Sequence, residues 1–220
     1  MKKYEHFVFE VYETILDDSK AIIDRKKYLA DNIFTLLEKA LFPVKHSAVQ
    51  KAVESLFEKL KEKKEVFSVF QQVEFIINIL KINDIILFKK IYDCYVESSL
   101  QISPVPYHNI SRALELLAEN NKNIYLICNT IQTTGYILKF ILKENNLYHF
   151  FKDFIFSEDL GIEFFNRATF EFFINKNELK KEEVVFITTM KNAHFEKSMG
   201  LNFELLKNES EIYNLLLSLI

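Results

Sequence analysis

The hydrophobic positions along this chain divide it into three regions with different periods. Residues 4–12 are apolar apart from Glu5, His6 and Glu10, and predict one buried strand. From about residue 18 to residue 99, apolar residues recur at helical spacing, and no segment alternates as a strand does. After Pro104-Val105-Pro106, short apolar runs alternate with amphipathic stretches. The pattern therefore predicts a strand, a helical region, and then alternating helices and strands.

The helical region contains four amphipathic stretches. The first carries an apolar stripe from Ile33 to Leu41, which Pro43 ends. The other three cover residues 46–64, 67–80 and 85–100, with Lys and Glu opposite the apolar face of the first of them. Four consecutive helices of this kind are typical of a helical bundle.

The last region predicts an α/β sheet. Predicted strands cover residues 124–128, 154–157, 184–188 and 203–206, and predicted helices cover residues 110–119, 135–144, 168–175, 195–199 and 209–219. Short apolar strands separated by helices indicate a parallel sheet with helices on both faces. Because the first strand belongs to that sheet, we expect an α/β core of residues 1–16 and 101–220, interrupted by an all-helical cap of residues 17–100.

Four segments carry a resemblance to a known family. The first, Phe7-Val8-Phe9-Glu10-Val11-Tyr12-Glu13-Thr14-Ile15-Leu16, resembles the opening motif of the haloacid dehalogenase-like (HAD) hydrolases, an apolar strand running into D-x-D-x-T-L. Residues 123–130 resemble the second motif, an apolar strand ending in Ser/Thr-Asn. Residues 135–161 resemble the downstream helix, strand and Ser-rich turn, and residues 182–187 the strand before the fourth motif. The resemblance implies a HAD-like Rossmannoid α/β fold with an inserted helical cap, of the phosphoglycolate phosphatase-like type.

The same resemblance implies a chemistry that these residues do not supply. In the family, an aspartate nucleophile forms an acyl-phosphate, a second aspartate handles the leaving-group proton, a lysine offsets phosphate charge, and late acidic residues hold Mg²⁺. Glu10 and Tyr12 stand at the two aspartate positions, and Cys128 stands at the Ser/Thr of the second motif. Phe164 aligns with the lysine and Thr189 with the aspartate of the fourth motif. We therefore expect no catalytic residue, cofactor or metal site.

Two alternatives keep some chemistry. A divergent phosphatase-like hydrolase could use Glu10 with weakly held Mg²⁺, although a carboxylate misplaced by about an ångström can cost roughly 10²-fold in rate. Tyr12, with an ordinary pKa of about 10, is a poor acid–base group near neutral pH. Cys128 could act as a thiol nucleophile with His194 as its base, but a packed, inert cysteine is the simpler interpretation.

Composition limits the remaining functions. The net charge of −3 does not indicate a nucleic-acid-binding surface, so we expect no nucleic-acid partner. No apolar run approaches the roughly 20 residues that span a bilayer, so we expect no membrane partner. Cys94 and Cys128 are far apart and predict reduced thiols in the cytoplasm. The phenylalanines at 164–165 and 172–173 either fill the vacated pocket or form an apolar groove.

The sequence thus predicts a HAD-like pseudoenzyme with a binding or regulatory role. We expect an unidentified protein or small-molecule ligand at the cap–core cleft. The apolar content of residues 67–87 fits either the interior of the bundle or a homodimer contact.

Overall fold

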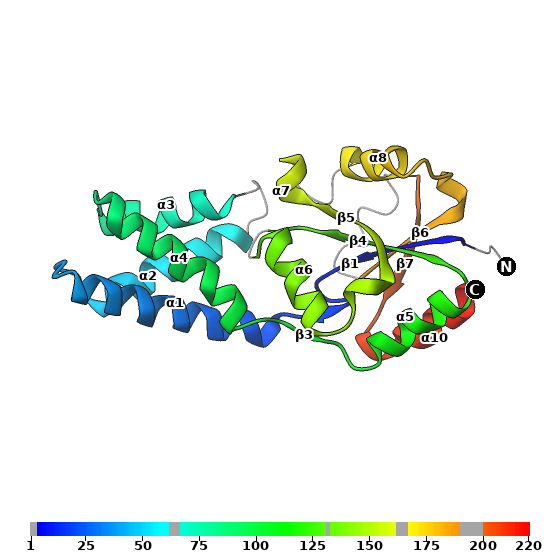
Figure 1. The fold of residues 1–220 in the computed structure, drawn as a ribbon, viewed down its shortest axis with the longest axis horizontal. Coiled ribbons are helices and arrows are strands. Elements are labelled where there is room, and N and C mark those ends of the chain that lie inside the picture. Colours follow the sequence, from blue (N-terminus) through cyan, green and yellow to red (C-terminus); the bar gives the residue numbers. More distant parts are fainter. Residues whose placement is uncertain (1–3, 62–66, 131–132, 162–166, 190–199) are drawn as a thin grey trace. The chain divides into compact units, whose positions relative to one another are not determined.

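The computed structural model describes residues 4–61, 67–130, 133–161, 167–189 and 200–220 (Figure 1). The chain forms two compact units. The α/β unit comprises residues 1–18, 105–129 and 139–220, and the helical unit comprises residues 19–104 and 130–138. The sequence pattern placed the cap at residues 17–100 and the core in the remainder.

The α/β unit is built on a five-stranded parallel sheet in the order β5-β4-β1-β6-β7. Its strands are β1 (His6–Glu10), β4 (Asn123–Cys128), β5 (Phe151–Phe156), β6 (Val184–Thr189) and β7 (Asn202–Leu206). Strand β1 is central, and its Phe9 lies beside Leu126 of β4 and Ile187 of β6. Phe7, Val8 and Phe9 are all buried because helices cover both faces of the sheet. The predicted parallel α/β sheet is confirmed.

Helices pack on the two faces of this sheet (Figure 1). They are α5 (Ile110–Glu119), α6 (Gly135–Glu144), α7 (Ser157–Leu160), α8 (Arg167–Lys176) and α10 (Ile212–Leu219), with short 3-10 turns at Tyr148–Phe150, Lys181–Glu183 and Glu209–Glu211. Helices α5 and α10 contact each other on one face, and α8 covers the other. On the α8 face, Phe170 meets the Phe186 ring edge-on, with centroids 4.7 Å apart. Phe173 meets Tyr125 in the same way at 5.1 Å.

The helical unit is a four-helix bundle. Its helices are α1 (Ser19–Lys39), α2 (His46–Lys61), α3 (Val69–Leu80) and α4 (Ile85–Gln101). Helix α1 contacts α2 and α4, and α3 contacts the same two, so the four enclose one apolar core. Ser68 forms a capping box with Gln71 at the start of α3, and the Asp84 carboxylate caps α4. No helix in the described ranges is long and apolar enough to cross a membrane.

One charged side chain lies inside the helical unit. Arg25 of α1 is 2% exposed, and its guanidinium donates to the Thr133 hydroxyl at 3.1 Å and to the Ile102 carbonyl at 3.0 Å. These bonds tie α1 to the end of α4 and to the segment that follows β4. Thr133 therefore joins the helical unit through a polar contact.

Several predicted boundaries are wrong. The strand predicted for residues 4–12 covers only His6–Glu10, and in the turn that follows Glu13 lies in the left-handed region at φ 68°. Helix α1 begins at Ser19, well before the apolar stripe that predicted it. Strand β5 begins at Phe151 and ends before Ser157, which starts α7.

Two short strands also escaped prediction. Leu16–Asp17 (β2) pairs antiparallel with Val105–Pro106 (β3). Two residues are too few to show a period, so only the pairing reveals them. The helix predicted for residues 195–199 lies outside the described residues.

Candidate functional site

Three strands of the α/β unit end together at one edge of the sheet. Strand β1 ends at Glu10, β4 at Cys128, and β6 at Thr188 and Thr189. Since β1 lies between β4 and β6 and all three run parallel, these residues meet at the carboxyl edge, where open α/β sheets bind ligands. This edge is the candidate site that the sequence motifs indicate.

Glu10 is hydrogen-bonded on both its side chain and its backbone. The Thr188 hydroxyl donates to Glu10 Oε2 at 2.6 Å, a length typical of a hydroxyl bonded to a carboxylate. The hydroxyl of Thr14 donates to the backbone carbonyl of Glu10. Thr14, the residue that keeps the family frame, therefore serves to hold the turn after β1.

A small void adjoins Glu10 on the α8 side. A void of about 10 Å³ lies there, lined by Glu10, Thr188 and Val8, Phe170, Phe186, Ile187 and Phe203. A void of about 10–15 Å³ is the smallest that holds one water molecule.

A second threonine engages the neighbouring acid. The Thr189 hydroxyl donates to Glu13 Oε2 at 3.0 Å. Thr189, which the sequence resemblance aligns with an aspartate of the fourth motif, thus bonds to a carboxylate in the turn after β1. Tyr12 is half-buried, and its backbone bridges to Leu16 within the same turn.

Cys128 is fully buried at the end of β4. Burial raises the pKa of its thiol well above the ordinary value, and the nearby carboxylates of Glu10, Glu158 and Asp18 raise it further. The thiol is therefore protonated near neutral pH, which argues against the thiol nucleophile. His194, its predicted base, lies outside the described residues.

The next strand adds one polar contact that the motifs did not single out. The hydroxyl of Ser157, which is 1% exposed, donates to the Asn129 side chain at 3.0 Å. Asn129 follows β4 and Ser157 follows β5, so this bond links two adjacent strand ends. Asn129 was visible in the second motif, but its partner follows only from the pairing of β4 with β5.

Two of the sequence-based expectations concern phenylalanines. Phe164 and Phe165 lie outside the described residues, as does Glu196. Of the other pair, Phe173 is fully buried in the aromatic cluster beneath α8, whereas Phe172 is 44% exposed. Phe173 therefore belongs to the core of the α/β unit, and the choice between a filled pocket and an apolar groove stays a prediction.

The donors at this edge do not fit the Mg²⁺ that the family resemblance implies. Mg²⁺ requires near-octahedral oxygen ligands, usually one or two carboxylates with substrate oxygens and waters. Here the carboxylates of Glu10 and Glu13 each accept a threonine hydroxyl. In the described part of the chain, no group of three or more His, Cys, Asp and Glu side chains is arranged to hold a metal. We therefore derive no step through a metal.

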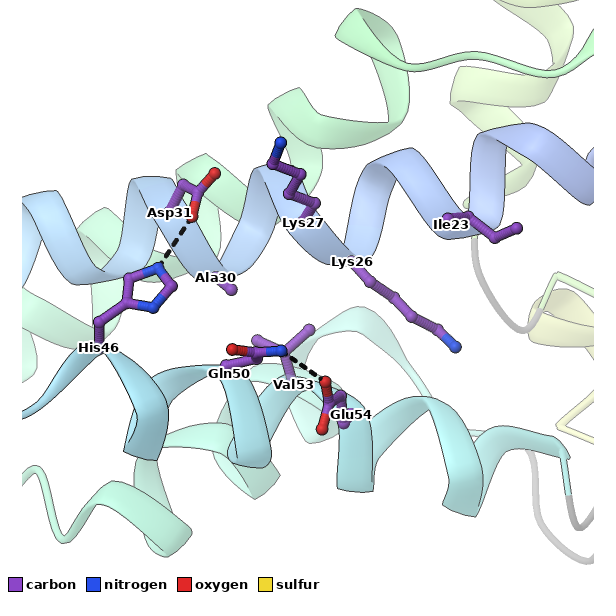
Figure 2. A pocket seen from close by; sticks show the side chains of 9 residues that line it. All are labelled: Ile23, Lys26, Lys27, Ala30, Asp31, His46, Gln50, Val53 and Glu54. Carbon is purple, nitrogen blue, oxygen red and sulfur yellow. Dashed lines mark hydrogen bonds and ion pairs between the residues drawn. The ribbon is translucent and has the colours of Figure 1, made fainter.

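The helical unit has a surface groove of its own, between α1 and α2 (Figure 2). Its volume is about 420 Å³, and buried Ala30 and Val53 form its floor. At one end His46 pairs with Asp31 at 2.8 Å, and along α2 the Gln50 amide donates to Glu54 at 2.9 Å. Both carboxylates of the groove are thus engaged by neighbours within it, and the His46–Asp31 pair joins the two helices.

Taken together, the sheet order, the inserted bundle and the position of the strand ends define the fold of the HAD-like hydrolases. Solved structures of that class cover nearly the whole chain. A 2-haloacid dehalogenase from Pseudomonas syringae pv. Tomato DC3000 matches with a TM-score of 0.70 at 16% identity, over 98% of this chain and 98% of that one. A HAD-hydrolase, YfnB from Bacillus subtilis, whose structure was determined with magnesium, matches with a TM-score of 0.68 at 16% identity, over 98% of this chain and 99% of its own.

A protein described as a predicted phosphoglycolate phosphatase, from Haemophilus somnus 129pt, matches with a TM-score of 0.60. Its identity is 15%, over 95% of this chain and 89% of that chain. No family model and no curated protein sequence matches this chain. At these identities the similarity establishes the fold, and the residues at the carboxyl edge must support any function.

Proposed function

We propose that this protein is a HAD-like pseudoenzyme that acts by binding, in a regulatory or scaffolding role, without phosphoryl transfer. The observation that carries the proposal is the bond from the Thr188 hydroxyl to Glu10 at 2.6 Å. The residue at the nucleophile position is held by a neighbouring strand.

The neighbouring positions support the same conclusion. Thr189 bonds to Glu13, and Cys128 is buried with a raised pKa. Tyr12 replaces the second aspartate of the motif. A nucleophile, an acid–base group and a metal ligand are thus replaced together by residues that bond to one another or pack. The two cysteines are free and buried, which also supports a location in a reducing compartment such as the cytoplasm.

The proposal is tested by turnover of two substrates suggested by the structural neighbours. They are p-nitrophenyl phosphate with Mg²⁺, for the phosphatases, and 2-chloropropionate, for the dehalogenases. We expect no release of nitrophenolate or chloride above the rate of the Glu10→Ala variant. Turnover by the wild-type chain that Glu10→Ala abolishes would instead establish the divergent hydrolase that uses Glu10.

The matched control is Glu13→Ala, which removes a second carboxylate bonded to a threonine at the same edge. A contaminating phosphatase would give the same rate in the wild type, in Glu10→Ala and in Glu13→Ala. Activity that depends on Glu10 alone identifies the nucleophile.

A further inference from the structure

One end of the helical unit exposes three large aliphatic side chains. Leu41, in the connection from α1 to α2, is 91% exposed. Ile85 and Ile86, in the first turn of α4, are 79% and 63% exposed. Figure 1 shows the α1–α2 and α3–α4 connections at the same end of the bundle. We refer to residues 39–45 and 81–90 as the lysine-rich tip.

The two connections enclose a shallow groove of about 480 Å³. Leu41 and Ile86 line it together with Lys81 and Lys90. The acid of the groove, Asp84, is occupied as the cap of α4, because its Oδ1 accepts the backbone N–H groups of Ile86 at 2.7 Å and Leu87 at 3.1 Å. The groove therefore combines an apolar surface with two ammonium groups.

The tip as a whole is strongly cationic. Its two segments contain five lysines and a single acid, Asp84; the lysines are Lys39, Lys45, Lys81, Lys89 and Lys90. All five are exposed, and within the described ranges none of them forms an ion pair. In a chain whose overall charge is −3, this concentration of positive charge is local.

The turn that ends α1 does not require a leucine at position 41. The N–H of Leu41 bonds to the Glu38 carbonyl and that of Phe42 to the Leu37 carbonyl, which ends α1 with Leu41 in the left-handed region at φ 55°. Glycine or asparagine is the usual residue at such a position, since a leucine there is strained. Phe42 packs against the core of the bundle, whereas the Leu41 side chain projects into solvent.

We propose that the lysine-rich tip docks on the surface of an anionic lipid bilayer. Leu41, Ile85 and Ile86 would insert at the level of the headgroups, while the lysines bind the lipid phosphates and carboxylates. A second copy of the chain fits poorly, because a symmetric contact would place five lysines against five lysines. The proposal goes beyond the role proposed for the α/β unit, and it revises the expectation of no membrane partner.

The test is binding of the full chain to phosphatidylcholine vesicles that contain about one third phosphatidylserine, measured by co-sedimentation. We expect binding that is lost with pure phosphatidylcholine and at high salt. Lys81→Glu/Lys90→Glu should weaken binding at least about tenfold, since each charge near such a surface contributes measurably. Leu41→Asn should weaken it roughly tenfold while leaving the fold intact, because asparagine tolerates the left-handed conformation.

The matched control is Lys20→Glu/Lys61→Glu, which makes the same charge change near the start of α1 and the end of α2, away from the tip. Equal loss of binding in this control would overturn the assignment to the tip, as would the absence of binding to the anionic vesicles. Binding to a polyglutamate peptide in place of the vesicles would overturn it in favour of an acidic protein. A dimer that Leu41→Asn dissociates, seen by analytical ultracentrifugation, would overturn it in favour of self-association.

The result of the vesicle test does not depend on whether the α/β unit is catalytically active. If the chain turns over p-nitrophenyl phosphate and also binds the vesicles, the pseudoenzyme proposal is wrong and the tip proposal stands. If it does neither, the pseudoenzyme proposal stands and the tip proposal is wrong.

Discussion

The hydrogen bond between Thr188 and Glu10 should contribute measurably to the free energy of unfolding. Thr188 is 3% exposed at the end of β6, and its hydroxyl donates to the Glu10 carboxylate at 2.6 Å. Thr188→Val keeps nearly the same volume and the β-branched shape that suits a strand. The substitution therefore removes the hydroxyl while disturbing the packing little.

The expected cost follows from the charge of the acceptor. A hydrogen bond to a charged group contributes about 1.5–3 kcal/mol, and a half-buried carboxylate that loses its donor retains part of its desolvation penalty. We expect Thr188→Val to lower the free energy of unfolding by about 2 kcal/mol. In a chain of this length that corresponds to roughly 4–8 °C in Tm.

The assay is urea unfolding followed by far-UV circular dichroism, on Thr188→Val, Glu10→Ala and the double variant. The two single losses should not add, because both remove the same bond, and the coupling should be at least about 1 kcal/mol. The control, Thr189→Val, removes the longer bond to Glu13 at 3.0 Å and should cost less. A Thr188→Val chain within about 0.5 kcal/mol of the wild type would refute the reasoning that Glu10 is held in place by β6.

Three further predictions concern buried polar groups. Burial, with a smaller effect of Glu97, raises the pKa of Cys94 to about 11, so the folded state favours the thiol over the thiolate. Its contribution to stability is complete below pH 9.0, the ordinary value, and is lost as the pH rises through about 11. Between about pH 8 and pH 10 the wild type should therefore lose about 1 kcal/mol more stability than Cys94→Ala in urea titrations. Cys128 should react with iodoacetamide at pH ~8 only after unfolding, as judged by mass spectrometry, and labelling of the native chain would contradict its burial. Thr133→Val, which removes one acceptor from the buried Arg25, should cost about 1–2 kcal/mol in the same titrations, and an unchanged midpoint would show that the bond contributes nothing.

The sequence by itself fixed the class of fold because that information is local. An apolar run at β1, the helical period of residues 33–100 and the short strands after Pro106 each identify an element from neighbouring residues alone. The ends of the helices and strands were harder to predict from the sequence. Strand β1 stops at Glu10, two residues short of the predicted end, and β2 and β3 are defined only by their pairing with each other.

The residues that the resemblance aligns with the family motifs were also visible in the sequence, since each motif is a short run with fixed spacing. Their consequences depended on tertiary structure. Residue 10 and residue 188 are far apart along the chain, and only the parallel register of β1 and β6 brings their side chains to 2.6 Å. The protonated state of Cys128 likewise depends on burial at the centre of a sheet and on carboxylates contributed by three other segments.

The same distinction holds for the helical unit. Periodicity predicted a bundle, because an amphipathic helix must bury its apolar stripe, and it identified the bundle core. It did not distinguish Leu41, Ile85 and Ile86 from that core, since an apolar residue has the same identity in the interior and on the surface. Whether such a side chain is buried or exposed is decided by which helices pack beside it, and that is a property of the assembled bundle alone.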